Sequence, residues 1–159
     1  MRGLGQSSSA MIVNSVPGRL QNVRFGTAFR GQRRTSPATI AGRIKKANQF
    51  SSASELVTTL SREEDLADAY VTLCIHAGIA ASDVITCNRL GEHTQGDDRG
   101  DTASLLAAVD AKLAEDLRAF LGMKTRAGYS ALPASADDVK RARRSVIRLV
   151  DAAEAAARD

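Results

Sequence analysis

The chain has 159 residues, of which 43% are hydrophobic and 4% aromatic, and it contains three prolines and no tryptophan. This length is enough for one domain with a buried core, and the scarcity of alternating β patterns excludes a protein built on sheets. The formal net charge is +4, but residues 1–54 carry nine bases and no acid, whereas the remainder carries thirteen bases and eighteen acids. A basic segment joined to a mildly acidic body differs from a uniformly basic nucleic-acid-binding protein.

Residues 1–36 are rich in glycine, serine and arginine and show no sustained hydrophobic period. This composition predicts a disordered basic arm, followed by one helical domain at residues 37–159. The arginines of the arm, with Phe25 and Phe29 among them, suggest a tail that binds phosphates and stacks on bases. A solvated extension and an organellar transit peptide are the alternatives.

The first predicted helix spans residues 37–60. Ser36 and Pro37 are typical of a helix start, because the N–H that proline lacks would have no partner in the first turn. Apolar residues then recur every three or four positions and mark the face expected to be buried: Ile40, Ile44, Ala47, Phe50, Ala53, Val57 and Leu60. Its bases are assigned to the solvated face: Arg43, Lys45 and Lys46.

Residues 61–93 are predicted to form the central helix, because this segment is apolar on nearly every side. Ser61 and Glu64 form a capping box at its start. One stripe spaced for helix packing consists of Leu66, Tyr70, Leu73, Ala77, Ala80 and Val84. A second stripe consists of Cys74, Gly78, Ala81 and Ile85. The residues of this second stripe are smaller, so a partner helix can come close there.

Both cysteines, Cys74 and Cys87, fall on this one helix, thirteen residues apart. At about 1.5 Å per residue their separation is roughly 20 Å, which excludes a disulfide between them and favours a reducing compartment. The sequence lacks both a secretory signal pattern and an unbroken apolar run of about 20 residues. We therefore expect a cytoplasmic location and no membrane association.

The remaining elements follow a polar loop at residues 91–101. Asp101 or Thr102 is the expected N-cap of the next helix. A stripe of Leu106, Val109, Leu113, Leu117 and Phe120 continues to the turn at residues 122–135. Asp110 is a second possible helix start, so the pattern leaves open whether one helix or two lie between Thr102 and Gly128. Ser135 and Asp138 then form the capping box of the last helix.

Metal and cofactor sites are not expected. The acids of the 91–101 loop do not fit an EF-hand, because Ala108 stands where the bidentate glutamate belongs. The two histidines and two cysteines are too few and too confined to one helix for a structural zinc site. The sequence also lacks the phosphate-binding, dinucleotide-binding and nucleophile-elbow motifs.

Three arginines of the last helix, Arg141, Arg144 and Arg148, are spaced to form one basic line. Such a line is typical of a ridge that follows nucleic-acid phosphates. The alternative is a solvated outer face whose charge is balanced by the acids of the same helix.

The order of these elements resembles the HEPN (higher eukaryote and prokaryote nucleotide-binding) domain. The central helix is similar to the family's A-Y-Y-x-x-x-H-A-A helix, with Tyr70 followed by His76-Ala77-Gly78. The family's following turn is matched by Leu90-Gly91-Glu92-His93. Lys124-Thr125-Arg126-Ala127-Gly128-Tyr129 is similar to its R-x-x-A-D-Y segment, with Gly128 where aspartate is usual. The resemblance implies an all-α, four- to five-helix up-and-down bundle.

Many members of this family are metal-independent ribonucleases with an R-x(4-6)-H motif that meets across a homodimer. Here the only close pair is Arg89 and His93, with three residues between them. An arginine can contact the phosphate and a histidine can transfer protons near neutral pH. The two would share one helix face only if the helix continued past Gly91.

The resemblance therefore implies a non-catalytic module that binds RNA, a nucleotide or a partner protein, as a homodimer or with a nucleotidyltransferase-like partner. A ribonuclease centred on Arg89 and His93, acting as the toxin of a toxin-antitoxin pair, is one alternative. A structural protein that assembles with itself is the other.

Three further residues are expected to anchor the bundle. His76 is assigned to the core as a buried, hydrogen-bonded histidine. Arg126 and Tyr129 are assigned to packing and anchoring, since tyrosine combines a large apolar face with one polar end.

Overall fold

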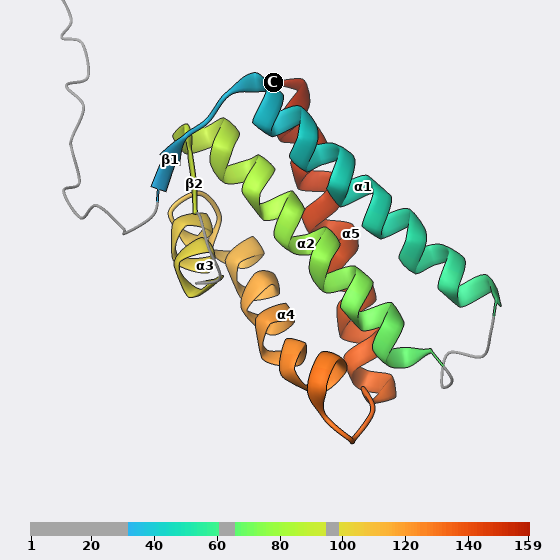
Figure 1. The fold of residues 1–159 in the computed structure, drawn as a ribbon. Helices are drawn as coiled ribbons and strands as arrows, with labels where there is room; N and C mark the ends of the chain where they lie inside the picture. The colour runs from blue at the N-terminus through green and yellow to red at the C-terminus, as the bar shows by residue number, and fades with distance from the viewer. Residues whose placement is uncertain (1–31, 61–65, 95–98) are drawn as a thin grey trace, which may run out of the picture.

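A computed structural model describes residues 32–60, 66–94 and 99–159. Within these ranges the chain forms five helices and two short strands (Figure 1): β1 Gln32–Arg34, α1 Pro37–Leu60, α2 Ala67–Leu90, β2 Glu92–Thr94, α3 Arg99–Ala107, α4 Ala111–Tyr129 and α5 Ala136–Arg158. The four long helices run up and down the bundle (Figure 1). The all-α class is therefore confirmed.

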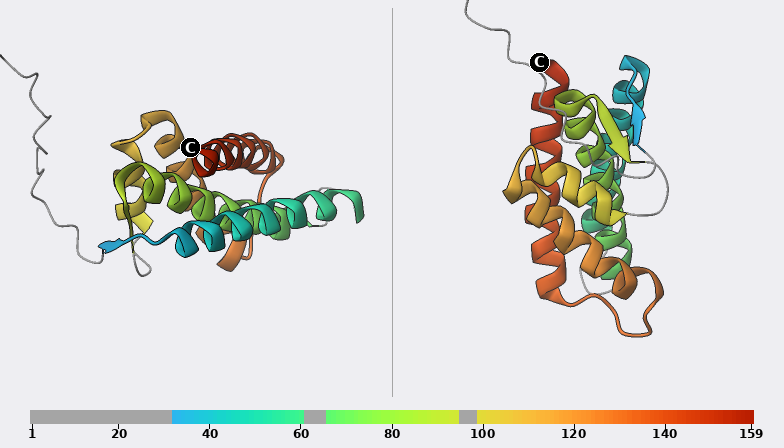
Figure 2. Two further views of the ribbon diagram at one scale, coloured as in Figure 1. Left: turned by 90° about the horizontal axis from the view of Figure 1, so that it is seen from above. Right: turned by 90° about the vertical axis from the view of Figure 1, so that its left-hand side faces the viewer.

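The central position of α2 is also confirmed, because α1, α4 and α5 all pack against it (Figures 1 and 2). Between Tyr70 and Cys87 every residue is buried except Thr72, Leu73 and His76. By length and composition α2 is apolar enough to cross a membrane, but 83% of its most apolar stretch is buried inside the bundle. Burial of this kind is typical of the core helix of a soluble protein.

The helix α2 is shorter than the predicted 61–93. It ends at Leu90 because Gly91 takes the left-handed conformation, with φ of 71°, and its N–H donates to the Cys87 carbonyl at 3.0 Å. At the other end Leu66 is the N-cap and offers no side-chain hydrogen bond. The capping box predicted at Ser61 and Glu64 lies outside the described residues.

The predicted close approach of a neighbouring helix to the small-residue stripe of α2 is observed at Gly78. A Cβ atom added to Gly78 would lie 2.3 Å from Cε2 of Phe120 on α4 and 3.2 Å from Cδ1 of Leu149 on α5. Both of these side chains are fully buried. Gly78 is thus the point where α2 makes room for two neighbouring helices at once.

The bounds of α1 match the prediction. Ser36 caps its start, since its Oγ accepts a hydrogen bond from the Thr39 N–H at 3.2 Å. Most of the predicted inner face contacts the core, but only Ala47 and Ser54 are fully buried in this helix. Leu60 is 80% exposed, so its assignment to the buried face is wrong.

Two helices, rather than one, occupy residues 99–129. The Asp110 carboxylate accepts hydrogen bonds from the N–H groups of Lys112 and Leu113, at 2.9 and 3.0 Å, and so starts α4. The helix α3 begins at Arg99, ahead of Asp101 and Thr102, so the N-cap predicted at those two residues is wrong.

The capping box of α5 is confirmed. The Asp138 N–H donates to Ser135 Oγ at 3.2 Å, and the Ser135 N–H donates to Asp138 Oδ2 at 3.0 Å. The predicted inward side chains of this helix, from Val139 to Ala153, are all buried.

The strand pair was not predicted. β1 pairs with β2 in antiparallel register, with Arg33 opposite His93. The expected disordered arm at residues 1–36 is therefore wrong at its end, where residues 32–34 form a strand. Its other residues, 1–31, lie outside the described residues. Local periodicity gives no sign of this pairing, because each strand is only three residues long.

Candidate functional site

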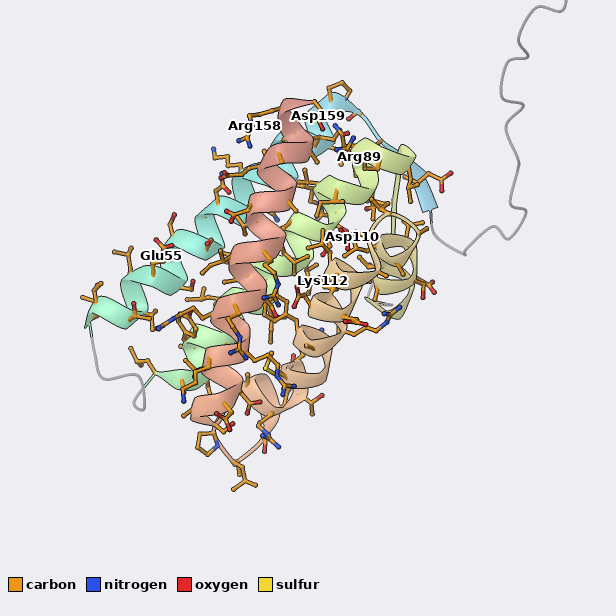
Figure 3. All side chains as sticks on the ribbon, turned by 180° about the vertical axis from the view of Figure 1, so that it is seen from behind. Glu55, Arg89, Asp110, Lys112, Arg158 and Asp159 are labelled. Atoms are coloured by element: carbon orange, nitrogen blue, oxygen red, sulfur yellow. The ribbon has the colours of Figure 1, made fainter. Side chains whose placement is uncertain are left out.

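Arg89, the first half of the predicted catalytic pair, is bound to the end of α5. Its Nη2 lies 2.7 Å from Oδ2 of Asp159, and both side chains are about half exposed (Figure 3). A surface pair of this kind contributes at most about 1 kcal/mol. It nevertheless directs the guanidinium toward the C-terminal end of α5.

His93, the second half of the pair, is buried on β2. Its side chain is 6% exposed, and its Nδ1 has no hydrogen-bond partner among the described residues. The left-handed Gly91 ends α2 before this point, so Arg89 and His93 do not share a helix face. Within the described residues no hydrogen bond or ion pair joins them.

An ion pair with a buried acid and a half-buried base lies one to two turns before Arg89 on α2. Oδ2 of Asp83, which is fully buried, lies 3.4 Å from Nη1 of Arg43 on α1. The assignment of Arg43 to the solvated face is therefore wrong. The signal that sequence reasoning missed was Asp83 itself, because a carboxylate on a helix apolar all round requires a cation from a neighbour.

Both cysteines are buried and unreactive in this environment. Burial raises the pKa of the Cys87 thiol and that of the Cys74 thiol. Since the thiolate is the nucleophile, neither cysteine is a candidate for covalent catalysis.

Arg148, one of the three predicted phosphate ligands, is paired with an acid of α4, although its side chain is 43% exposed. Its guanidinium makes a bidentate pair with Asp116 of α4, with Nε 2.7 Å from Oδ2, and Ser145 Oγ donates to the same carboxylate at 2.8 Å. Burial alone would raise the pKa of Asp116, but the hydrogen bonds from Arg148 and Ser145 outweigh it, so the pKa is lowered. Arg148 therefore ties α5 to α4.

The other two phosphate candidates, Arg141 and Arg144, are exposed on the outer side of α5. No ion pair or hydrogen bond to either side chain occurs in the part of the chain that the structure describes. Neighbouring Lys140 makes only a long contact of 3.9 Å with Asp137, and both of these side chains are largely exposed. In the predicted basic line of α5, the guanidinium groups of Arg141 and Arg144 are thus available to a ligand.

Among the predicted anchors, Arg126 fits the expected role. Its Nη1 lies 3.0 Å from Oδ2 of Asp138, the acid of the α5 capping box. The end of α4 is thereby connected to the start of α5. Asp68 of α2 holds the same turn, because its Oδ1 accepts from the Ala134 N–H at 2.7 Å.

The assignment of His76 to the buried core is wrong, and Tyr129, which was assigned to packing and anchoring, lies largely in solvent. His76 is exposed, and its ring stacks on Phe50 of α1 with centroids 5.2 Å apart. Tyr129 is 82% exposed. Both line a shallow pocket of about 190 Å³ between α2 and α4, together with Lys124. His76 lies at the edge of the contact between α1 and α2, which a one-helix pattern does not reveal.

A larger groove runs between α1 and α5. One part, of about 410 Å³, includes Glu55 of α1 and Asp151 and Glu154 of α5. The adjoining part, of about 330 Å³, includes Tyr70 and Arg143. Arg143 lies over the Tyr70 ring at 5.7 Å, and burial raises the pKa of Tyr70 to about 12. The sequence does not indicate this groove, because its two walls come from helices that lie far apart in the chain.

The described residues contain no group of three or more histidine, cysteine or acidic side chains placed to hold a metal ion. Comparison of the chain with protein-family models, with curated proteins and with solved structures finds no match.

Proposed function

We propose that this protein is a non-catalytic, HEPN-like module that binds RNA through the outer side of α5. The observation that carries the proposal is that Arg141 and Arg144 are exposed there without an acidic partner among the described residues. Exposed guanidinium groups suit phosphate, because their planar N–H groups form two parallel hydrogen bonds with it. Contacts of this kind go to the phosphates and not to the bases, which favours binding that is independent of RNA sequence.

The contacts favour this function over the ribonuclease. A catalytic histidine must reach the substrate, whereas His93 is 6% exposed, and Arg89 is paired with Asp159. Under the ribonuclease alternative, the protein cleaves RNA in EDTA and His93→Ala abolishes the cleavage. Our proposal expects no cleavage by either protein.

Homodimer formation, a nucleotidyltransferase-like partner and a cytoplasmic location belong to the same proposal, and they rest on the resemblance and on the sequence. Light scattering tests the first of these. A stable dimer that binds no RNA would favour the structural, self-assembling alternative.

The test of RNA binding is a salt titration with single-stranded RNA. We compare the parent chain with an Arg141→Ala, Arg144→Ala double variant. The control is a Lys45→Ala, Lys46→Ala double variant, which removes the same charge from exposed positions on α1. Each lost phosphate contact reduces the slope of log affinity against log salt by about 0.7, so the α5 variant should lose about 1.4 and the control nothing.

Two results would contradict the proposal. One is the absence of salt-dependent RNA binding by the parent chain. The other is an equal loss of slope in both double variants, which would mean that only net charge matters.

A further inference from the structure

The groove between α1 and α5 combines acidic side chains with an apolar surface. Three of its residues are acids, Glu55, Asp151 and Glu154, and the part that all three line contains no base, whereas the adjoining part, which Glu55 also lines, contains Arg143. Ile147, also in this lining, is 53% exposed. Figure 3 views the molecule with α5 in front and labels Glu55 on α1.

These three carboxylates are available to a ligand. Within the described residues none of them has an ion pair or a side-chain hydrogen bond. The acids at the two ends of α5 differ in this respect, since Asp137, Asp138 and the C-cap residue Asp159 each contact a base. A groove of about 410 Å³ with this lining suits a peptide segment that carries both arginines and apolar side chains.

The chain itself contains such a segment. Residues 1–31 include four arginines and no acid, and two of those arginines, Arg24 and Arg30, lie next to Phe25 and Phe29. We propose that the segment 1–31 binds, within the same molecule, in the groove between α1 and α5. Its arginines then pair with the groove carboxylates, and its apolar side chains cover Ile147.

The length of the segment is sufficient for this contact. The groove residues of α1 begin at Asn48, eleven positions after Pro37, which is about 17 Å along the helix axis. An extended chain of 31 residues spans roughly 100 Å. The segment therefore reaches the groove from β1 with many residues to spare.

The experiment is a paramagnetic relaxation measurement on the full chain. A nitroxide is attached to an Asn22→Cys variant, since the native Cys74 and Cys87 are 0% and 2% exposed and do not react. At about 50 mM salt the methyl signals of Ile147 and Val150 should broaden, whereas that of Ile79, between α2 and α4, should not. At about 500 mM salt the broadening should largely disappear, because the Debye length falls well below 10 Å.

The matched variants replace charge without changing shape. Glu55→Gln, Asp151→Asn and Glu154→Gln together should lower the ratio of bound to unbound segment about tenfold, as expected for the loss of three surface ion pairs. A control with Glu115→Gln and Asp137→Asn, exposed acids outside the groove, should keep the broadening. Circular dichroism establishes that both variants are folded.

Two results would overturn the inference. One is the absence of broadening at Ile147 and Val150 at low salt. The other is broadening that also appears in unlabelled molecules mixed with spin-labelled ones, because the segment would then bind a second copy. Neither readout involves RNA, so this inference and the proposed function fail independently.

Discussion

At the scale of single residues, Gly78 is the described glycine whose surroundings leave no room for a side chain. A methyl group there would lie 2.3 Å from the Phe120 ring, and Phe120 is fully buried, so it has little room to move. We expect Gly78→Ala to reduce the free energy of unfolding by about 1–3 kcal/mol. Urea denaturation followed by circular dichroism measures this change.

Gly122 supplies the control for that variant. It lies on the exposed side of α4, with nothing within 4 Å of the position where a Cβ would stand. Gly122→Ala should raise the free energy of unfolding by up to about 1 kcal/mol, because alanine is the better helix former. Equal effects of the two substitutions would mean that α2 and α4 are not in close contact at Gly78.

The Asp116–Arg148 pair should make stability depend on pH. The pKa of Asp116 is lowered in the folded protein, so its ionised form stabilises the fold above the unfolded pKa, and that stability is lost as pH falls through the folded value. We expect Asp116→Asn to cost about 1–3 kcal/mol at pH 7 and much less near pH 3. Urea unfolding at the two pH values measures the difference.

Asp138 also has a lowered pKa and is present in both proteins, so it does not contribute to this difference. A loss of stability in the Asp116→Asn variant that is the same at both pH values would contradict the account.

Single residues were the least predictable part of the molecule. The packing role of Gly78 and the helix start at Asp110 follow from residue type and spacing, which are local. The exposure of His76 and Tyr129 and the pairing of half-buried Arg43 with Asp83 depend on which neighbour covers which side of a helix. That information is absent from the pattern of one segment.

At the scale of elements, the start of α5 depends on Asp138. Its carboxylate accepts from the Ser135 N–H and hydroxyl and from Arg126, so one side chain caps α5 and connects it to α4. We expect Asp138→Ala to lower the free energy of unfolding by about 1–2 kcal/mol. Thermal or urea denaturation measures the loss.

Asp137 is the matched control at that helix end. It is also acidic and in the first turn, but its side chain is 92% exposed and its one base contact is 3.9 Å long. Asp137→Ala should change the free energy of unfolding by less than about 0.5 kcal/mol. If both alanine variants lost the same stability, charge near the helix terminus would explain the effect and the capping box would not.

The helix starts at Ser36 and Ser135 were predicted, the start at Asp110 was one of two possibilities, and the end of α2 was placed three residues too late. Ser36, Asp110 and Ser135 each begin a helix with a hydrogen bond to its first turn, and Gly91 ends α2 with a positive φ. The strands β1 and β2 escaped prediction because three residues are too few to show a period and their partners lie far apart in the sequence.

At the scale of the whole molecule, the sequence predicts a bundle around α2. This segment is apolar on nearly every side, and such a helix is normally surrounded by other helices. It does not predict the groove between α1 and α5, because these two helices lie near opposite ends of the described chain. The basic line of α5 was visible as a pattern. The pattern does not show that Arg148 pairs with Asp116 while Arg141 and Arg144 have no such partner among the described residues. That difference is seen only in the side-chain contacts of the structure.

The most direct test of the proposed function is an NMR titration of the full chain with single-stranded RNA in EDTA. The account predicts that the side-chain signals of Arg141 and Arg144 shift as RNA is added, that those of Arg89 and His93 do not, and that the RNA keeps its length. Shifts centred on Arg89 and His93, together with shortened RNA, would contradict it and establish the tip of α2 as a ribonuclease centre.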